Sequence, residues 1–78
     1  MIKYNLKALI SEKEFNEGRR VTYDEIAKST GISITTLSKI ANTKGYDTAV
    51  SKIEKLCLYF NCTPEDLITI VQENAEKD

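Results

Sequence analysis

Residues 23–41 decide the fold of this chain, and they read YDEIAKSTGISITTLSKIA. Ile26 belongs to a first short apolar face, and Leu37 and Ile40 recur three residues apart, as on one side of a helix. Gly31 lies between the two segments, where a residue without a Cβ adopts a positive φ most readily. This spacing predicts two short helices joined by a tight turn, which is a helix-turn-helix motif.

Each of these two helices is expected to begin at a capping residue. Thr22 precedes the first helix and Glu25 follows three residues later, the pattern of a capping box in which the glutamate returns to the threonine backbone. Ser33 has the same place before the second helix, which we expect at residues 34–41. This second helix is rich in Thr and Ser, which have poor helix propensity, so we interpret its hydroxyls as facing a binding partner.

A helix is also expected before the motif, at residues 5–15. Leu6, Leu9 and Ile10 follow helical spacing in this segment. Gly18 comes shortly after it and suits the left-handed position that ends many helices. The sequence therefore predicts a helix that packs beside the motif.

Two further helices are expected after the motif. Thr48 caps a helix through residue 60, with an apolar stripe formed by Val50, Ile53, Leu56, Cys57 and Phe60. A fifth helix begins with Thr63 as its N-cap and Pro64 at its first position, followed by two acidic residues. We expect its packing residues to be Leu67, Ile68 and Val71.

These elements predict an all-α fold, a compact five-helix bundle. No stretch shows the alternation of apolar and polar residues that is typical of a half-buried strand. The chain has 78 residues, a length that suits one domain. We expect that domain over residues 1–72, with a polar, frayed tail at residues 73–78.

The composition argues against an enzyme, a metal site and a membrane protein. The chain has no histidine and no glycine-rich phosphate loop. Cys57 and Cys62 alone are too few ligands for structural zinc, so we expect two buried apolar thiols, with no catalytic residue, metal or cofactor. No apolar run approaches the roughly 18 residues of a membrane span, and no signal-peptide core is present. A cytoplasmic protein is expected.

Charge is distributed unevenly although the net charge is only −1. Residues 19–52 carry six basic and three acidic side chains, whereas residues 53–78 carry two basic and six acidic ones. A basic middle segment suits an anionic partner when that segment also contains a recognition motif. Segments of this length also vary by a few charges through chance, so the pattern has meaning only together with the motif.

Two stretches resemble the Cro and phage-repressor (Xre-like) family of helix-turn-helix regulators. Residues 32–40, ISITTLSKI, are similar to the family's recognition helix, and residues 55–67, KLCLYFNCTPEDL, to its fourth helix, turn and fifth helix. The resemblance covers roughly residues 6–68. It implies a lambda-repressor-like fold and a regulator of transcription, acting as a repressor, that binds a specific sequence of double-stranded DNA.

The resemblance also implies which residues contact DNA. The recognition helix enters the major groove, and the side chains expected to read base edges are Ile34, Thr35, Ser38 and Lys39. Phosphate contacts are expected from Tyr23, Ser33, Thr36, Asn42, Thr43 and Lys44. This chain departs from the family in having Tyr23 in place of the usual glutamine. Its loop glycine, Gly45, also falls two residues later than usual, so we expect a rearranged loop.

The connection before the motif is longer than is usual in the family. It carries Arg19 and Arg20 directly before the second helix, beside the expected DNA strand. We therefore propose that both arginines contact phosphates. Two solvated loop arginines are an equally good interpretation.

A protein-interaction module, such as an antitoxin, would use the acidic segment from Ile53 onward to bind a protein partner. Single-stranded nucleic acid binding is disfavoured because the four tyrosines are scattered along the chain. The family resemblance implies a homodimer on a (pseudo)palindromic operator, formed through the fifth helix and through Leu58, Tyr59 or Ile70. No small-molecule ligand is expected.

Overall fold

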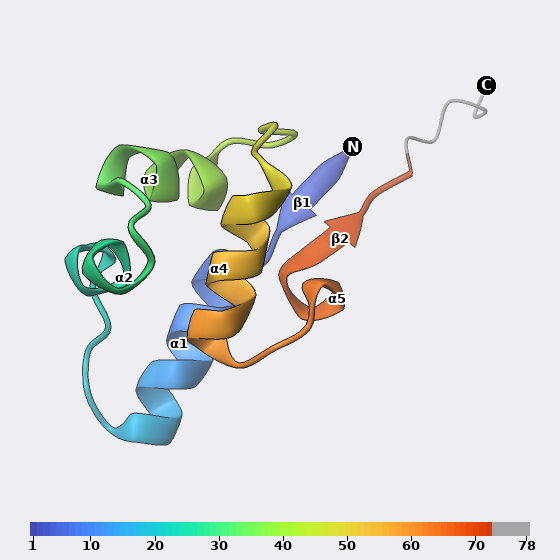
Figure 1. Cartoon of the computed structure of the whole chain (residues 1–78). Helices are drawn as coiled ribbons and strands as arrows, with labels where there is room; N and C mark the ends of the chain where they lie inside the picture. The colour runs from blue at the N-terminus through green and yellow to red at the C-terminus, as the bar shows by residue number, and fades with distance from the viewer. Residues whose placement is uncertain (73–78) are drawn as a thin grey trace.

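The five expected helices are present in a computed structural model, which describes residues 1–72 (Figure 1). The tail expected at residues 73–78 lies outside this description. In chain order the elements are β1 Ile2–Tyr4, α1 Leu6–Glu17, α2 Tyr23–Thr30, α3 Ile34–Asn42, α4 Val50–Phe60, α5 Pro64–Leu67 and β2 Ile68–Ile70. The mostly helical fold is therefore confirmed, with a small two-stranded sheet added to it.

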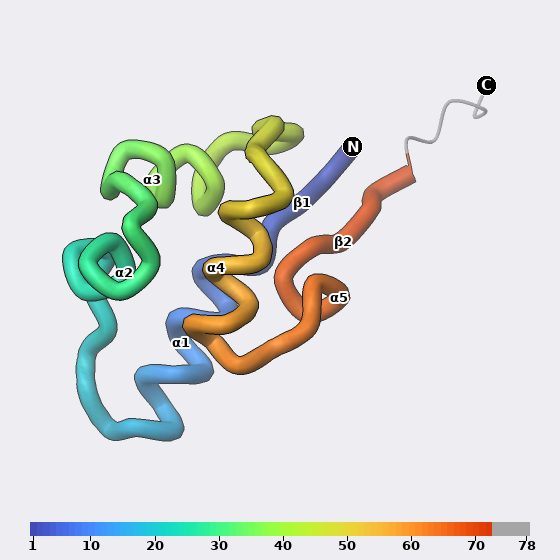
Figure 2. The backbone as a smooth tube through the Cα atoms, viewed as in Figure 1, coloured from blue at the N-terminus to red at the C-terminus, as the bar shows by residue number. Residues whose placement is uncertain are grey.

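The sheet joins the two ends of the described chain. β1 and β2 pair antiparallel, with Ile2 opposite Ile70 and Tyr4 opposite Ile68 (Figures 1 and 2). The expectation that no strand forms was therefore wrong, and so was the expectation that Ile68 and Val71 extend the fifth helix. All three residues of β2 are β-branched, which favours an extended backbone once a partner strand is available.

The starts and ends of α2 and α3 follow the predicted capping residues. The Thr22 hydroxyl accepts from the Glu25 N–H at 3.2 Å, and the Ser33 hydroxyl accepts from the Thr36 N–H at 3.1 Å. Gly31 ends α2 with a φ of 80°, and its N–H donates to the Ala27 carbonyl. The turn of the helix-turn-helix motif is therefore built as the sequence predicts.

The fourth helix differs from its prediction at its first turn. It begins at Val50, with Ala49 rather than Thr48 as the N-cap residue. Val50 is 82% exposed, so it does not belong to the buried stripe with Ile53 and Leu56. As the first residue of α4, Val50 lies at an end of the helix that no neighbouring element covers.

A single hydrophobic core draws on all five helices. Its fully buried side chains are Leu6, Ile26, Leu37, Ile40, Leu56 and Leu67. α2 packs against both α3 and α4, and α1 packs against α3. The core therefore holds α3 from one side and leaves its other side to solvent.

Within residues 1–72 no helix is long and apolar enough to cross a lipid bilayer.

Candidate nucleic-acid interface

α3 lies on the outside of the molecule, directly next to α2 (Figure 1). Leu37 and Ile40 hold it to the core, and Ile32, just before the helix, is buried as well. These anchors recur on the inner side of α3, so the residues between them face outward. The helix-turn-helix motif thus presents one face of α3 on the surface.

The four side chains predicted to read bases lie together on the exposed side of α3. Ile34 is 46% exposed, Thr35 and Lys39 are exposed, and Ser38 is half-buried. Positions 34 and 38, like positions 35 and 39, are four residues apart and therefore neighbours on a helix surface. Lys39 forms no ion pair with any residue in the described part of the chain. This face combines one apolar group, two hydroxyls and one free ammonium.

Two of the predicted phosphate ligands are engaged at the start of α3. The Ser33 hydroxyl caps the helix and lies 3.0 Å from the Thr36 hydroxyl, to which it donates. Ser33 is exposed, and Thr36 and Tyr23 are half-buried. Tyr23 is the first residue of α2, so it lies at the positive end of that helix dipole.

The other predicted phosphate ligands lie at the end of α3. The Asn42 side-chain amide donates to the Ser38 carbonyl at 2.9 Å, while Thr43 and Lys44 are exposed. Gly45 has a φ of 69° and donates its N–H to the Ile2 carbonyl at 3.1 Å. Gly45 is therefore the residue of this loop that has a left-handed backbone conformation, and its hydrogen bond to Ile2 holds the loop against β1.

Arg19 has ligands within its own chain. Its guanidinium binds the Glu25 carboxylate through two nitrogens, at 2.8 and 2.7 Å, and donates to Glu17 at 2.9 Å. These carboxylates hold Arg19 across the connection between α1 and α2. Arg20 is exposed and pairs with no acid among residues 1–72. The two arginines therefore differ in how freely they can reach a phosphate.

Sequence reasoning missed the role of Glu25. Its carboxylate does not return to Thr22, so the expected capping box is only half formed. Instead it binds Arg19 and accepts from the Tyr59 hydroxyl at 3.2 Å. The Lys13 ammonium lies 4.9 Å from the centre of the Tyr59 ring, a cation–π geometry. This network connects α1, α2 and α4, and nothing in the local spacing of these residues indicates it.

The hydrogen bonds of this network lower the pKa values of two of its glutamates. The hydrogen bond from Arg19 lowers the pKa of Glu25, and the hydrogen bond from Lys13 lowers the pKa of Glu17. Both carboxylates are therefore held in the charged form that binds the cations.

The cysteines lie away from α3. Cys57 is buried and Cys62 is half-buried, and both are free thiols, so the expectation of two buried thiols is wrong for Cys62. Burial, with Cys57 beside it, raises the pKa of Cys62 to about 11. A thiol that stays protonated at neutral pH is a poor nucleophile, so Cys62 adds no nucleophile to the interface.

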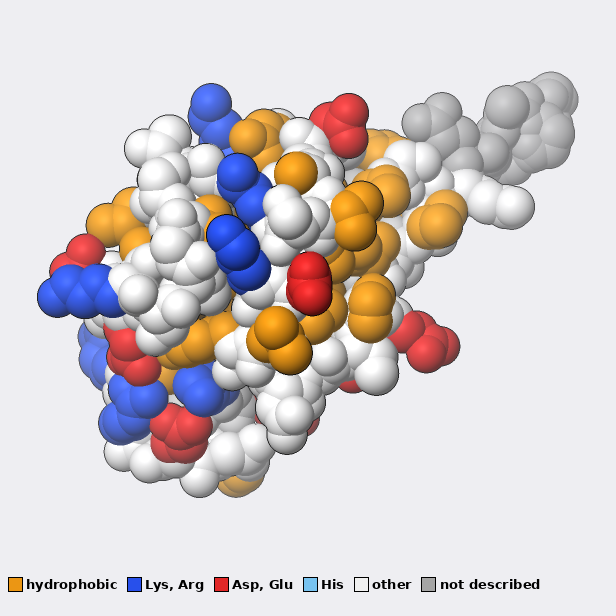
Figure 3. Space-filling view, in the orientation of Figure 1, with side chains coloured by type: hydrophobic (Ala, Val, Ile, Leu, Met, Phe, Trp, Pro, Cys, Tyr) orange, Lys and Arg blue, Asp and Glu red, His pale blue; other side chains and the backbone are white. Residues whose placement is uncertain are grey.

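Basic and hydrophobic side chains gather on different halves of the face drawn in Figure 3. In Figure 3 most lysine and arginine side chains lie over the half that contains α2, α3 and the connection from α1. Hydrophobic side chains gather over α4 and over the α5–β2 segment. On the face drawn in Figure 3, most of the visible basic side chains therefore lie on the half that contains the motif, with acidic side chains among them.

The comparisons with known proteins agree with this geometry. The model of the Cro/C1-type HTH DNA-binding domain matches residues 5–73. No curated protein matches the chain. The matched range begins just before α1 and extends past β2, so it includes the motif, the five helices and the core that positions α3. The chain therefore belongs to the family of Cro/C1-type helix-turn-helix DNA-binding domains.

Proposed function

We propose that this DNA-binding protein recognises a specific double-stranded operator and represses transcription, with α3 in the major groove. The observation that carries the proposal is the outward face of α3, formed by Ile34, Thr35, Ser38 and Lys39. The opposite face is anchored by Leu37 and Ile40, so the part of the α3 backbone that carries these four side chains is held against the core.

The chemistry of this face suits base recognition. A half-exposed isoleucine provides the apolar contact by which a thymine methyl is read. The Lys39 ammonium can donate to O6 and N7 of guanine, and the hydroxyls of Thr35 and Ser38 can meet either kind of base edge. A face with only one cation contributes little general attraction, so affinity must also come from phosphate contacts.

The phosphate contacts are proposed around this face. We assign them to Arg20 and, at the two ends of the motif, to Tyr23, Ser33, Thr36, Asn42, Thr43 and Lys44. Arg19 is kept as a weaker candidate, because a phosphate would have to compete with Glu17 and Glu25 for its guanidinium.

Selection from a random pool of duplexes tests this function. The wild type is expected to enrich one sequence family, and Lys39→Ala to lower the affinity ratio of selected to random DNA by about tenfold. Lys55→Ala is the matched control, since Lys55 is an exposed lysine of α4 without an ion pair in the described chain. Unchanged discrimination by Lys39→Ala would contradict the placement of α3.

A homodimer on a palindromic operator forms part of the proposal. The apolar side chains that support it are Leu58 of α4 and Ile70 of β2, each 74% exposed. Tyr59 is half-buried and bonded to Glu25, so it contributes little to such a contact. α5 has only four residues, which moves the expected contact from the fifth helix to α4 and β2. Sedimentation at micromolar concentration tests the assembly.

A protein partner is the second candidate function. The exposed Val50 and Leu58 flank Glu54 on one stripe of α4, at the start of the acidic part of the chain. A protein-interaction module would retain no duplex even at low salt, and it would purify with its partner. Duplex retention by the isolated chain would argue against it.

A further inference from the structure

Three lysines from different elements converge on one groove. Lys3 of β1, Lys7 of α1 and Lys44 of the loop after α3 all line a depression of about 480 Å³ between β1 and that loop. The other lining side chains are apolar or uncharged, and none is an acid: Met1, Ile2, Tyr4, Ile40, Ala41, Asn42, Thr43 and Val71. The groove therefore carries three positive charges in a chain whose net charge is −1.

No ion pair in the described chain involves these lysines. Each of the three is exposed, and the ion pairs among residues 1–72 involve only Lys13 and Arg19 as cations. Lys7 lies in the first turn of α1, which contains no acidic residue. A cation there is repelled by the helix dipole, whereas an anion near it is stabilised. Lys7 is therefore unfavourable for the stability of α1 at this position.

The groove is continuous with the DNA-binding surface. Asn42, Thr43 and Lys44 belong both to its lining and to the proposed phosphate contacts after α3. The Gly45 N–H bonds to Ile2, and the Tyr4 hydroxyl donates to the Tyr46 carbonyl at 2.8 Å. These two bonds hold β1 against the loop, so the lysines of the N-terminal segment keep a fixed position relative to α3.

We propose that Lys3 and Lys7, together with Lys44, bind phosphates of the DNA backbone and extend the contact beyond the end of α3. This inference rests on the proposed DNA-binding mode and adds to it a segment far from the motif in sequence. A lysine binds a phosphate as a point charge, so this contact adds affinity without sequence preference. An apolar floor suits lysine stems, which can lie along apolar surface while their ammonium groups stay in water.

The test is the salt dependence of binding to the selected operator within a longer duplex. Each phosphate contact contributes about 0.9 to the slope of log K against log salt, so Lys3→Gln with Lys7→Gln should reduce the slope by about 1.8. Lys44→Gln should reduce it by about 0.9. Discrimination against random duplexes should not change, and thermal unfolding should confirm that the variants fold.

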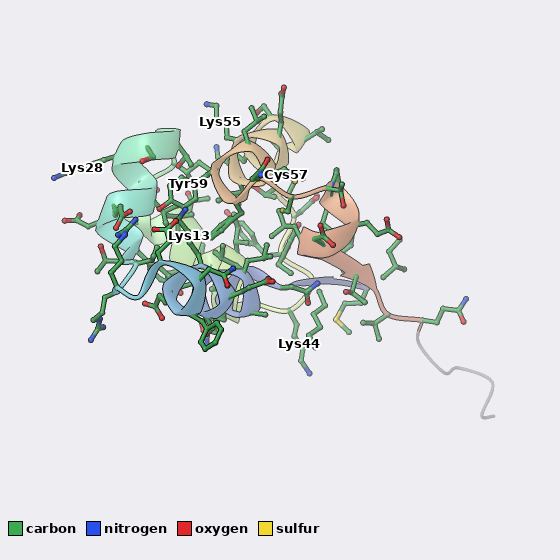
Figure 4. The ribbon with its side chains drawn as sticks, turned by 90° about the horizontal axis from the view of Figure 1, so that it is seen from below. Lys13, Lys28, Lys44, Lys55, Cys57 and Tyr59 are labelled. Atoms are coloured by element: carbon green, nitrogen blue, oxygen red, sulfur yellow. The ribbon has the colours of Figure 1, made fainter. Side chains whose placement is uncertain are left out.

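The control is Lys55→Glu, which changes the net charge by the same amount as the double variant. Figure 4 shows Lys44 and Lys55 on opposite sides of the molecule, and Lys55 is not among the residues that line the groove. This control should leave the slope within error of the wild type. An equal loss in Lys55→Glu and in the double variant would indicate net charge alone and would overturn the groove.

Phosphate ethylation gives a second readout. Ethyl groups on the phosphates that meet Lys3 and Lys7 should weaken the wild type and have no effect on the double variant. A wild-type slope and a wild-type ethylation pattern in the double variant would overturn the groove but not the function. A wild type that retains no duplex would overturn both.

Discussion

Arg19 lies in the connection between α1 and α2 with carboxylates of its own chain on two sides. Its fork-shaped guanidinium suits the bidentate bond to Glu25, and it also reaches Glu17 (2.8 Å). The side chains of all three are partly exposed, so water and salt weaken the attraction. The network orders the connection, and it contributes only modestly to stability.

At the residue scale, pH should reveal this network. The pKa of Glu25 is lower in the folded state than its ordinary value of 4.5, so the pair stabilises the fold above that value and loses its effect as pH falls through the folded pKa. The thermal midpoint of the wild type should therefore fall more steeply below about pH 4.5 than that of Glu25→Gln. Circular dichroism melts over a pH series measure this.

The control for this prediction is Glu54→Gln. Glu54 is exposed on α4 and forms no ion pair among residues 1–72. This variant should retain the steep acid limb of the wild type. Parallel pH profiles for Glu25→Gln and the wild type would show that the network is not formed in solution.

At the scale of elements, the turn between α2 and α3 depends on Gly31. Its φ is 80°, and a Cβ added there would meet no atom within 4 Å. Gly31→Ala should therefore lower the free energy of unfolding by about 1–2 kcal/mol through backbone strain alone. Urea unfolding measures this difference.

Asparagine gives the matched comparison at this turn. It tolerates the left-handed region better than alanine does, so Gly31→Asn should cost less. Equal losses for the two variants would mean that the turn relaxes to another conformation.

Residues 68–70 form a strand that the local sequence does not predict. The capping residue Thr63 and the proline after it correctly indicate a helix, and Asp66 accepts from the Thr63 N–H at 3.1 Å. That helix nevertheless ends at Leu67, where the backbone N–H of Asn5 bonds to its carbonyl at 2.7 Å. The strand then forms because β1 is beside it, and β1 lies more than 60 positions away in the sequence.

At the scale of the whole molecule, one core supports every helix. Leu56 is fully buried, so Leu56→Ala should lower the free energy of unfolding by about 2–5 kcal/mol, a large part of a small domain's stability. Leu58→Ala on the same helix is the control, because Leu58 is 74% exposed. It should change stability by less than about 0.5 kcal/mol and weaken self-association. Denaturant melts and sedimentation check the two outcomes.

A reversed result would change the interpretation of α4. A large loss of stability in Leu58→Ala would show that the fold of each chain depends on the proposed homodimer. A small loss in Leu56→Ala would show that the core collapses around the smaller side chain.

The sequence by itself determined the two helices of the motif, the turn between them and the outward face of α3. Helical spacing, capping residues and Gly31 act over at most a few residues, so their consequences follow from local geometry. Ile34, Thr35, Ser38 and Lys39 could be placed on one outward face for the same reason, since Leu37 and Ile40 must be buried.

Only the tertiary structure decided which distant residues meet. Three such features join separate elements: the pairing of β1 with β2, the bonds of Glu25 to Arg19 and Tyr59, and the groove that Lys3 and Lys44 both line. Such contacts depend on how the helices pack around a shared core, and no periodicity within one segment encodes that arrangement. α3 can therefore be predicted from the sequence, whereas the surface around α3 forms only when the chain folds.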